Sequence, residues 1–147
     1  PRRRRHLFRR LVGGVVEVVE AGAALEPGDA AVMPRGGYPP FAYHATGHGA
    51  RLESVPYREA RADLGALALR AREPSARLLY LSTPDNPMGG LWPAADVGSL
   101  IEAAPANCLV LLDEAYLETA SAGSALALDL SRPNLLRFRT FSKTNFS

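Results

Sequence analysis

Lysine and cysteine are nearly missing from this chain of 147 residues, which carries one of each. The single Cys108 excludes a disulfide within the chain. Because Cys108 lies in an apolar run, we expect it to be a small buried core residue. No run approaches the roughly 20 apolar residues of a membrane span. We therefore expect a cytoplasmic protein with no membrane partner.

Acidic residues are absent from the first ten positions, which hold six arginines. The rest of the chain, residues 11–147, has 11 basic and 15 acidic residues, so its net charge is −4. A basic arm can bind nucleic acid, but the acidic body and the absence of a nucleic-acid-binding motif argue against that partner. We expect residues 1–10 to be a basic, disordered tail.

Lys143 is the only lysine against sixteen arginines, and it follows an apolar run. Guanidinium stays protonated in proteins, whereas an ammonium group can be shifted to a neutral, nucleophilic amine. A lone lysine at the end of a strand is therefore a candidate Schiff-base nucleophile. The alternative is that one codon escaped the compositional bias, and this residue by itself leaves both interpretations open.

The chain alternates short apolar runs with helical patterns. Apolar runs predict strands at 30–33, 78–81 and 108–112, and residues 51–55 and 135–141 also read as strands. Stripes at helical spacing predict helices over 61–72, on Leu64, Leu67, Ala68 and Ala71, and from Pro93 to Pro105, on Val97, Leu100, Ile101 and Ala104. Strands that are continuously apolar and alternate with helices indicate an α/β fold, a three-layer, mainly parallel sheet with helices on both faces.

Ligands of such sheets bind outside the carboxyl ends of the strands. This rule selects residues 83–90, 113–116 and 142–143. The first segment is dense in Pro, Asn, Asp and Gly, which is typical of a plain turn; alternatively, its prolines stiffen a loop that holds the Asn86 amide in a fixed direction. Tyr38, after the first strand, is either a core residue or an aromatic that stacks on a planar ligand.

The sequence also carries partial patterns of a nucleoside-triphosphate site and of a metal site. Asp113 and Glu114 follow an apolar strand, as the Mg²⁺-binding acid of a phosphate-loop NTPase does, but the glycine and lysine pattern of that loop is absent. His44 and His48 are four residues apart, which could pair them as metal ligands on a helix. No further ligands lie nearby in sequence, and two glycines weaken a helix there, so we expect no metal site.

Three segments in order resemble the large domain of the fold type I (aspartate aminotransferase-like) pyridoxal-phosphate enzymes, and most closely its histidinol-phosphate aminotransferase branch. Residues 83–89, TPDNPMG, are similar to the N-P-x-N-P-T-G loop of that family. Residues 113–116 read D-E-A-Y and residues 139–143 read R-T-F-S-K, as the family does. The resemblance covers about residues 25–143.

The resemblance implies pyridoxal 5'-phosphate as cofactor and a role for each matching residue. Lys143 would form a Schiff base with the cofactor aldehyde and later move a proton on the substrate. Asp113 would pair with the pyridine nitrogen and keep it protonated. Asn86 and Tyr116 would hydrogen-bond the phenolic oxygen of the ring.

Two further contacts are implied, together with the organisation of the protein. Tyr38 would stack on the ring and Ser142 would contact the phosphate. Residues 11–147 would form a partial large domain that lacks the C-terminal small domain of the family, and the protein, if complete, would be a homodimer. The family's arginine after the lysine, which binds the phosphate, is not seen here.

The implied reaction transfers an amino group between an amino acid or amino-phosphate and a 2-oxo acid. Two alternatives stay open. The chain could be a truncated, non-catalytic fragment or pseudoenzyme of the family, because the small domain is missing. It could also be a pyridoxal-phosphate-dependent decarboxylase or lyase, because the cofactor supplies chemistry that these enzymes share.

Overall fold

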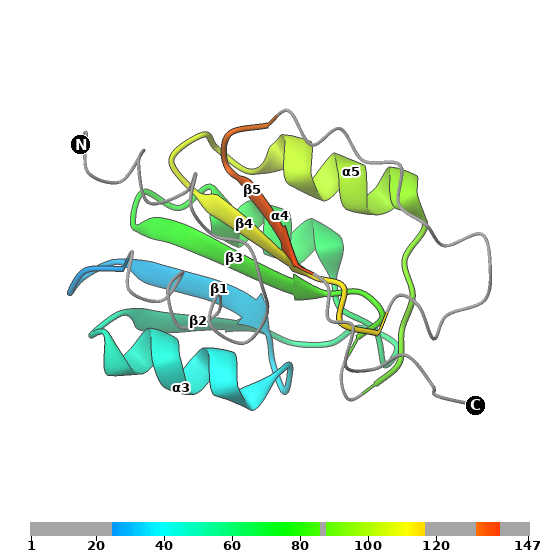
Figure 1. Cartoon of the computed structure of the whole chain (residues 1–147), viewed down its shortest axis with the longest axis horizontal. Helices are drawn as coiled ribbons and strands as arrows, with labels where there is room; N and C mark the ends of the chain where they lie inside the picture. The colour runs from blue at the N-terminus through cyan, green and yellow to red at the C-terminus, as the bar shows by residue number, and fades with distance from the viewer. Residues whose placement is uncertain (1–24, 86–87, 117–131, 139–147) are drawn as a thin grey trace.

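The computed structural model describes residues 25–85, 88–116 and 132–138. Five parallel strands form one sheet in the order β2-β1-β3-β4-β5 (Figure 1). The strands are β1 (Ala30–Pro34), β2 (Arg51–Val55), β3 (Ala76–Ser82), β4 (Leu109–Asp113) and β5 (Leu135–Phe138). The helices of this part of the chain are α3 (Pro39–Gly47), α4 (Leu64–Ala71) and α5 (Ala94–Ala103).

The sheet is covered on both faces (Figure 1). Alternate residues of β1, β3 and β4 point to opposite faces, as strand geometry requires. One face packs with α4 and α5 around Val32, Leu79, Leu81, Val110 and Leu112. The other packs with α3 around Ala31, Met33, Leu78, Tyr80 and Leu111. These two cores confirm the predicted three-layer α/β architecture, and Cys108 is fully buried as expected.

Both predicted helices form, and their apolar stripes face the core. The α4 helix begins at Leu64, later than predicted, because residues 58–61 make a tight turn closed by hydrogen bonds between Arg58 and Arg61. The Asp63 carboxylate then caps the helix by accepting from the Ala66 N–H at 2.9 Å. Pro93 is the N-cap of α5, and Pro105 follows its C-cap.

The α3 helix was not predicted from the sequence. Its first turn carries Pro39 and Pro40, which suit that position. Only Phe41 and Ala45 are buried, so its apolar stripe is too narrow to stand out in the sequence. Gly47 ends the helix instead of preventing it.

The topology marks one place on the sheet for a ligand. From β1 the chain enters α3 on one face, and from β3 it enters α5 on the other. Neighbouring strands whose connections diverge in this way leave a crevice outside their carboxyl ends. In this sheet the crevice lies beyond Pro34 and Ser82, and Ser82 is level with Asp113 of β4. In the described segments, no helix is both long and apolar enough to cross a membrane.

Candidate functional site

The residues that follow the strands gather at this carboxyl edge. Tyr38 follows β1, residues 83–85 follow β3, and Asp113 to Tyr116 end and follow β4. The predicted site residues Asn86, Ser142 and Lys143 lie outside the described residues. The structure thus brings three of the six predicted side chains, Tyr38, Asp113 and Tyr116, to one edge of the sheet.

Asp113 is a buried carboxylate that neutral groups hold in place. Its Oδ2 accepts a hydrogen bond from the Tyr80 hydroxyl at 2.7 Å, and its Oδ1 accepts from the Ala115 N–H at 3.0 Å. Burial raises the pKa of Asp113, the neighbouring Glu114 adds to the rise, and the two hydrogen bonds oppose it. Among the described side chains, no cation forms an ion pair with Asp113.

Tyr80 supplies one of those hydrogen bonds from the middle of the sheet. Its ring is 1% exposed and stacks on Phe41 of α3, with 4.5 Å between the ring centroids. Burial and the adjacent Asp113 raise the pKa of Tyr80 far above its ordinary value, so it stays a neutral donor. Tyr80 is not among the residues predicted from the sequence, although it is the one polar-tipped side chain in the run Leu78–Leu81.

Thr83 carries an unpartnered polar atom at the same edge. The residue is fully buried, and its N–H donates to the Asp113 carbonyl at 2.9 Å. Its Oγ1 is buried and has no hydrogen-bond partner among the described residues. Leaving a buried hydroxyl unsatisfied costs about 1–3 kcal/mol. An orphaned hydroxyl beside Asp113 is what a site for a polar ligand would contain.

The loop after β3 is held by hydrogen bonds at both ends. The Asp85 N–H donates to the Gly90 carbonyl and the Gly89 N–H to the Asp85 carbonyl, each at 2.8 Å. The Asp85 carboxylate accepts from the Tyr57 hydroxyl at 2.7 Å. The described ends of the loop are therefore fixed, and its role in orienting the Asn86 amide stays a prediction.

Glu114, the residue after Asp113, forms a buried ion pair with Arg137 of β5. Arg137 donates from Nε to Oε2 at 3.0 Å and from Nη2 to Oε1 at 2.8 Å. The Glu114 side chain is fully buried and the Arg137 side chain is 12% exposed. Arg137 is not among the residues predicted from the sequence, although an arginine inside an apolar strand is a visible signal.

Tyr38 and Tyr116 are both half-buried. Tyr38 packs partly against the α3-side core and adds to the rise in the pKa of Tyr80, so its phenol lies near the Tyr80–Asp113 pair. This position satisfies the core interpretation and leaves part of the ring accessible. The stacking and hydrogen-bonding roles of the two tyrosines stay predictions.

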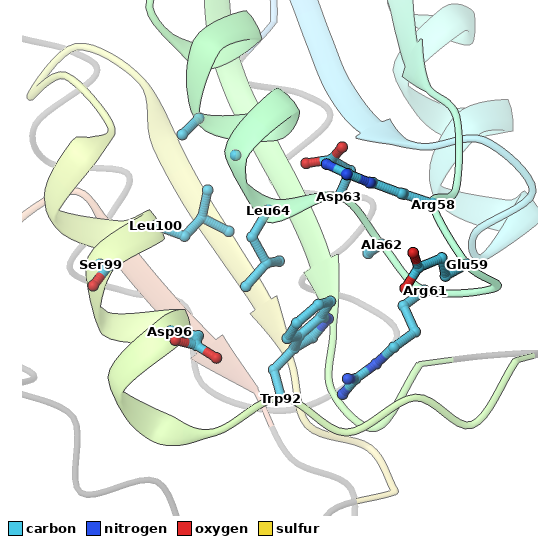
Figure 2. Close-up of a pocket in the computed structure, with 12 residues that line it drawn as sticks. Arg58, Glu59, Arg61, Ala62, Asp63, Leu64, Trp92, Asp96, Ser99 and Leu100 are labelled. Atoms are coloured by element: carbon cyan, nitrogen blue, oxygen red, sulfur yellow. The ribbon is translucent and has the colours of Figure 1, made fainter.

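A separate groove of about 560 Å³ lies between α4 and α5, beside the loops that precede them (Figure 2). Figure 2 shows the Arg61 guanidinium beside Trp92, 4.0 Å from its ring centroid. Arg61 also donates to the Leu91 carbonyl. No predicted site residue lines this groove, so it is separate from the site that contains Asp113.

His44 lies within α3 and His48 is its C-cap. In the described ranges, no three His, Cys, Asp or Glu side chains are grouped as metal ligands.

Asp113 at the carboxyl edge fits a cofactor that carries a cationic ring nitrogen. A carboxylate can accept about four hydrogen bonds, and Asp113 uses two of them on neutral donors. A buried anion without a cation is stabilised by a ligand that brings one. Pyridoxal phosphate has such a group in its protonated ring nitrogen.

Comparison with known proteins identifies relatives over most of this chain. Residues 11–145 match the family Aminotransferase class I and II. The histidinol-phosphate aminotransferase of Symbiobacterium thermophilum is 38% identical over 122 residues, which are 81% of this chain and 33% of that protein. Its counterpart from Methanothermobacter thermautotrophicus is also 38% identical, over 81% of this chain and 31% of that protein.

A solved structure shows the same similarity. The crystal structure of histidinol-phosphate aminotransferase from Sinorhizobium meliloti, in complex with pyridoxal-5'-phosphate, is 44% identical and superposes with a TM-score of 0.78, over 86% of this chain and 35% of that one. The chain spans about a third of the length of the curated relatives it matches. Because the family match extends over nearly the whole sequence, the chain belongs to the class I and II aminotransferases.

Proposed function

We propose that this protein is a pyridoxal-phosphate-dependent aminotransferase of the histidinol-phosphate aminotransferase type. It would transfer an amino group between an amino acid or amino-phosphate and a 2-oxo acid. The observation that carries the proposal is Asp113, a buried carboxylate at the topological ligand position with no cation beside it in the described structure. Proteins to which this chain is similar are named as histidinol-phosphate aminotransferases.

The chain's residues divide the work between binding and proton movement. Bound pyridoxal phosphate supplies an electron sink for the electrons released at the substrate Cα. Asp113 holds the proton on the ring nitrogen, and Tyr38 offers a partly exposed ring for stacking. Lys143 supplies the amine that holds the cofactor aldehyde and moves the substrate proton.

The remaining predicted residues orient the cofactor. Asn86 and Tyr116 hydrogen-bond the phenolic oxygen of the ring, and Ser142 contacts the phosphate. The hydrogen bonds at Asp85 and Gly90 hold the chain on both sides of the segment that carries Asn86. The unpartnered Thr83 hydroxyl gives this edge one further polar atom for a ligand.

The chain corresponds to the large, cofactor-binding domain of such an enzyme, with a basic tail at residues 1–10. It would act in the cytoplasm, as part of a homodimer and in amino-acid biosynthesis. The structures of cystalysin from Treponema denticola and of a C–S lyase from Staphylococcus hominis are 16–17% identical to this chain, and this likeness shows the fold alone. No specific observation favours a lyase or decarboxylase, so the aminotransferase is the single function proposed.

Covalent capture of the cofactor tests this proposal. The chain is mixed with pyridoxal phosphate, reduced with borohydride, digested and analysed by mass spectrometry. We expect one major adduct, on Lys143. The matched control is Lys143→Arg, which keeps the positive charge but cannot become a nucleophilic amine.

Two outcomes would contradict the proposal. An adduct that persists in Lys143→Arg would place the cofactor on another amine. Absence of any specific adduct in the wild-type chain, together with absence of turnover with histidinol phosphate and a 2-oxo acid, would favour the non-catalytic alternative.

A further inference from the structure

The Tyr80–Asp113 contact joins a site residue to the centre of the sheet. Tyr80 lies two residues before Ser82, which is level with Asp113 on the neighbouring strand β4. Residues two apart on a strand share a face, and level residues of neighbouring strands do too. The two side chains therefore point to the same face, and the hydroxyl reaches the carboxylate at 2.7 Å.

We propose that Tyr80 is a positioning residue, whose hydroxyl fixes the Asp113 carboxylate in one orientation as a charged acceptor for the cofactor nitrogen. This inference rests on the proposed function, since the cofactor nitrogen is the cation that Asp113 would hold. Tyr80 acts through Asp113 and touches neither cofactor nor substrate.

The surroundings of Tyr80 leave its hydroxyl little freedom. The ring is fully enclosed, and Phe41 stacks on it at an interplanar angle of 21°. A phenol turns only about two side-chain bonds, so fixing the ring fixes the position of its oxygen. Asp113 is then held from two sides, by Tyr80 on Oδ2 and by the Ala115 N–H on Oδ1.

A neutral donor suits this purpose better than a cation would. An arginine or lysine beside Asp113 would cancel the charge that the cofactor nitrogen needs. A phenol favours the ionised carboxylate through a hydrogen bond and leaves its net charge intact. Burial and Glu114 both disfavour that charged form, so the two hydrogen bonds are what oppose them.

The chain contains a matched pair that separates positioning from ordinary packing. Tyr57 donates to the Asp85 carboxylate at the same distance of 2.7 Å, in a partly buried setting. Tyr57→Phe removes an equivalent phenol–carboxylate bond away from Asp113. Tyr80→Phe keeps the stacked ring and removes only the hydroxyl at Asp113.

The first experiment follows the Asp113 carboxyl by carbon-13 NMR in the chain without cofactor, as the pH is varied. We expect Tyr80→Phe to raise the pKa of Asp113 above the wild-type value, because it removes a bond to the charged form. Tyr57→Phe leaves the Asp113 titration in place. An unchanged Asp113 titration in Tyr80→Phe would overturn the inference whether or not the cofactor binds.

The second experiment measures the affinity for pyridoxal phosphate by equilibrium titration. Tyr80→Phe should raise the dissociation constant roughly tenfold, the effect of losing one hydrogen bond to a charged group. The exposed Tyr43→Phe serves as the control with unchanged affinity. In an Asp113→Asn background the effect of Tyr80→Phe should vanish, because the two residues act as a unit.

An equal loss of affinity on both backgrounds would show a merely structural effect of Tyr80 and contradict positioning. If the wild-type chain binds no pyridoxal phosphate, the proposed function fails on that result. The carbon-13 titration still decides whether Tyr80 controls the charge of Asp113, so the two failures are distinguishable.

Discussion

Asp113 and Glu114 are adjacent buried acids with opposite surroundings. Arg137 neutralises Glu114 through two charge-assisted hydrogen bonds, whereas Asp113 has neutral donors. Both side chains are nearly inaccessible to water. The sheet thus neutralises the Glu114 charge with its own Arg137. It leaves the Asp113 charge available for a cation from a ligand.

The difference separates a structural acid from a binding acid. A buried ion pair with good geometry needs nothing further, and breaking it is costly. A buried carboxylate held by neutral groups keeps its charge at some cost to the fold. Such a residue at the carboxyl edge of a parallel sheet indicates a ligand site better than two adjacent acids in a sequence do.

Removal of the arginine should have the largest effect. Arg137→Met leaves the Glu114 charge buried without its cation, and we expect the free energy of unfolding to fall by about 3–5 kcal/mol. Urea denaturation measures this loss. Arg51→Met breaks the exposed Arg51–Glu53 pair and should cost less than about 1 kcal/mol. Equal losses in the two variants would remove the distinction between a structural and a surface pair.

The thiol of Cys108 is a third buried acidic group, and it shows the effect of burial on a pKa separately from that of hydrogen bonds. Burial raises the pKa of the Cys108 thiol from 9.0 to about 12. The unfolded chain therefore loses this proton first, and stability should fall between pH 9 and pH 12 by up to about 1.4 kcal/mol per pH unit. Thermal or urea unfolding of wild type and Cys108→Ala over this range measures it. A slope that is the same in both proteins would assign the effect to other groups.

Removal of the Asp113 charge should have the smallest effect on stability. Burial raises the pKa of Asp113, so the unfolded chain ionises first and wild-type stability declines as the pH rises above the ordinary aspartate range. Asp113→Asn lacks this decline. At neutral pH we expect its free energy of unfolding to match or exceed that of wild type by up to about 1 kcal/mol. A clear loss of stability would mean that the charge supports the fold.

Most of the architecture followed from the sequence because most elements carried a local signal. Continuous apolar runs identified β3 and β4 in the centre of the sheet, and the stripe of α5, from Val97 to Ala104, is buried as predicted. The α3 helix had no such signal, since only Phe41 and Ala45 of it reach the core. Its formation depends on packing against strands that are distant in the sequence.

Only the parts of the site that the linear sequence marks, the strand ends and the matching motifs, could be predicted. The strand-end rule selected the segments 83–90, 113–116 and 142–143, and the resemblance gave single residues in them a role. Of these residues, Asn86, Ser142 and Lys143 lie outside the described residues. Tyr80 and Arg137 were not predicted, because their roles depend on contacts between neighbouring strands. Tyr80 is 33 residues from Asp113 in the sequence, and Arg137 is 23 residues from Glu114. A tyrosine in an apolar run looks like any core aromatic until the carboxylate beside it is located.

The most direct test is to titrate the Asp113 carboxyl by carbon-13 NMR with and without saturating pyridoxal phosphate. If Asp113 is reserved for a cation, the cofactor supplies one, and the pKa of Asp113 should fall when the cofactor binds. A cofactor-loaded chain in which Asp113 titrates as it does alone would contradict this account. The buried carboxylate would then have no part in holding the cofactor ring.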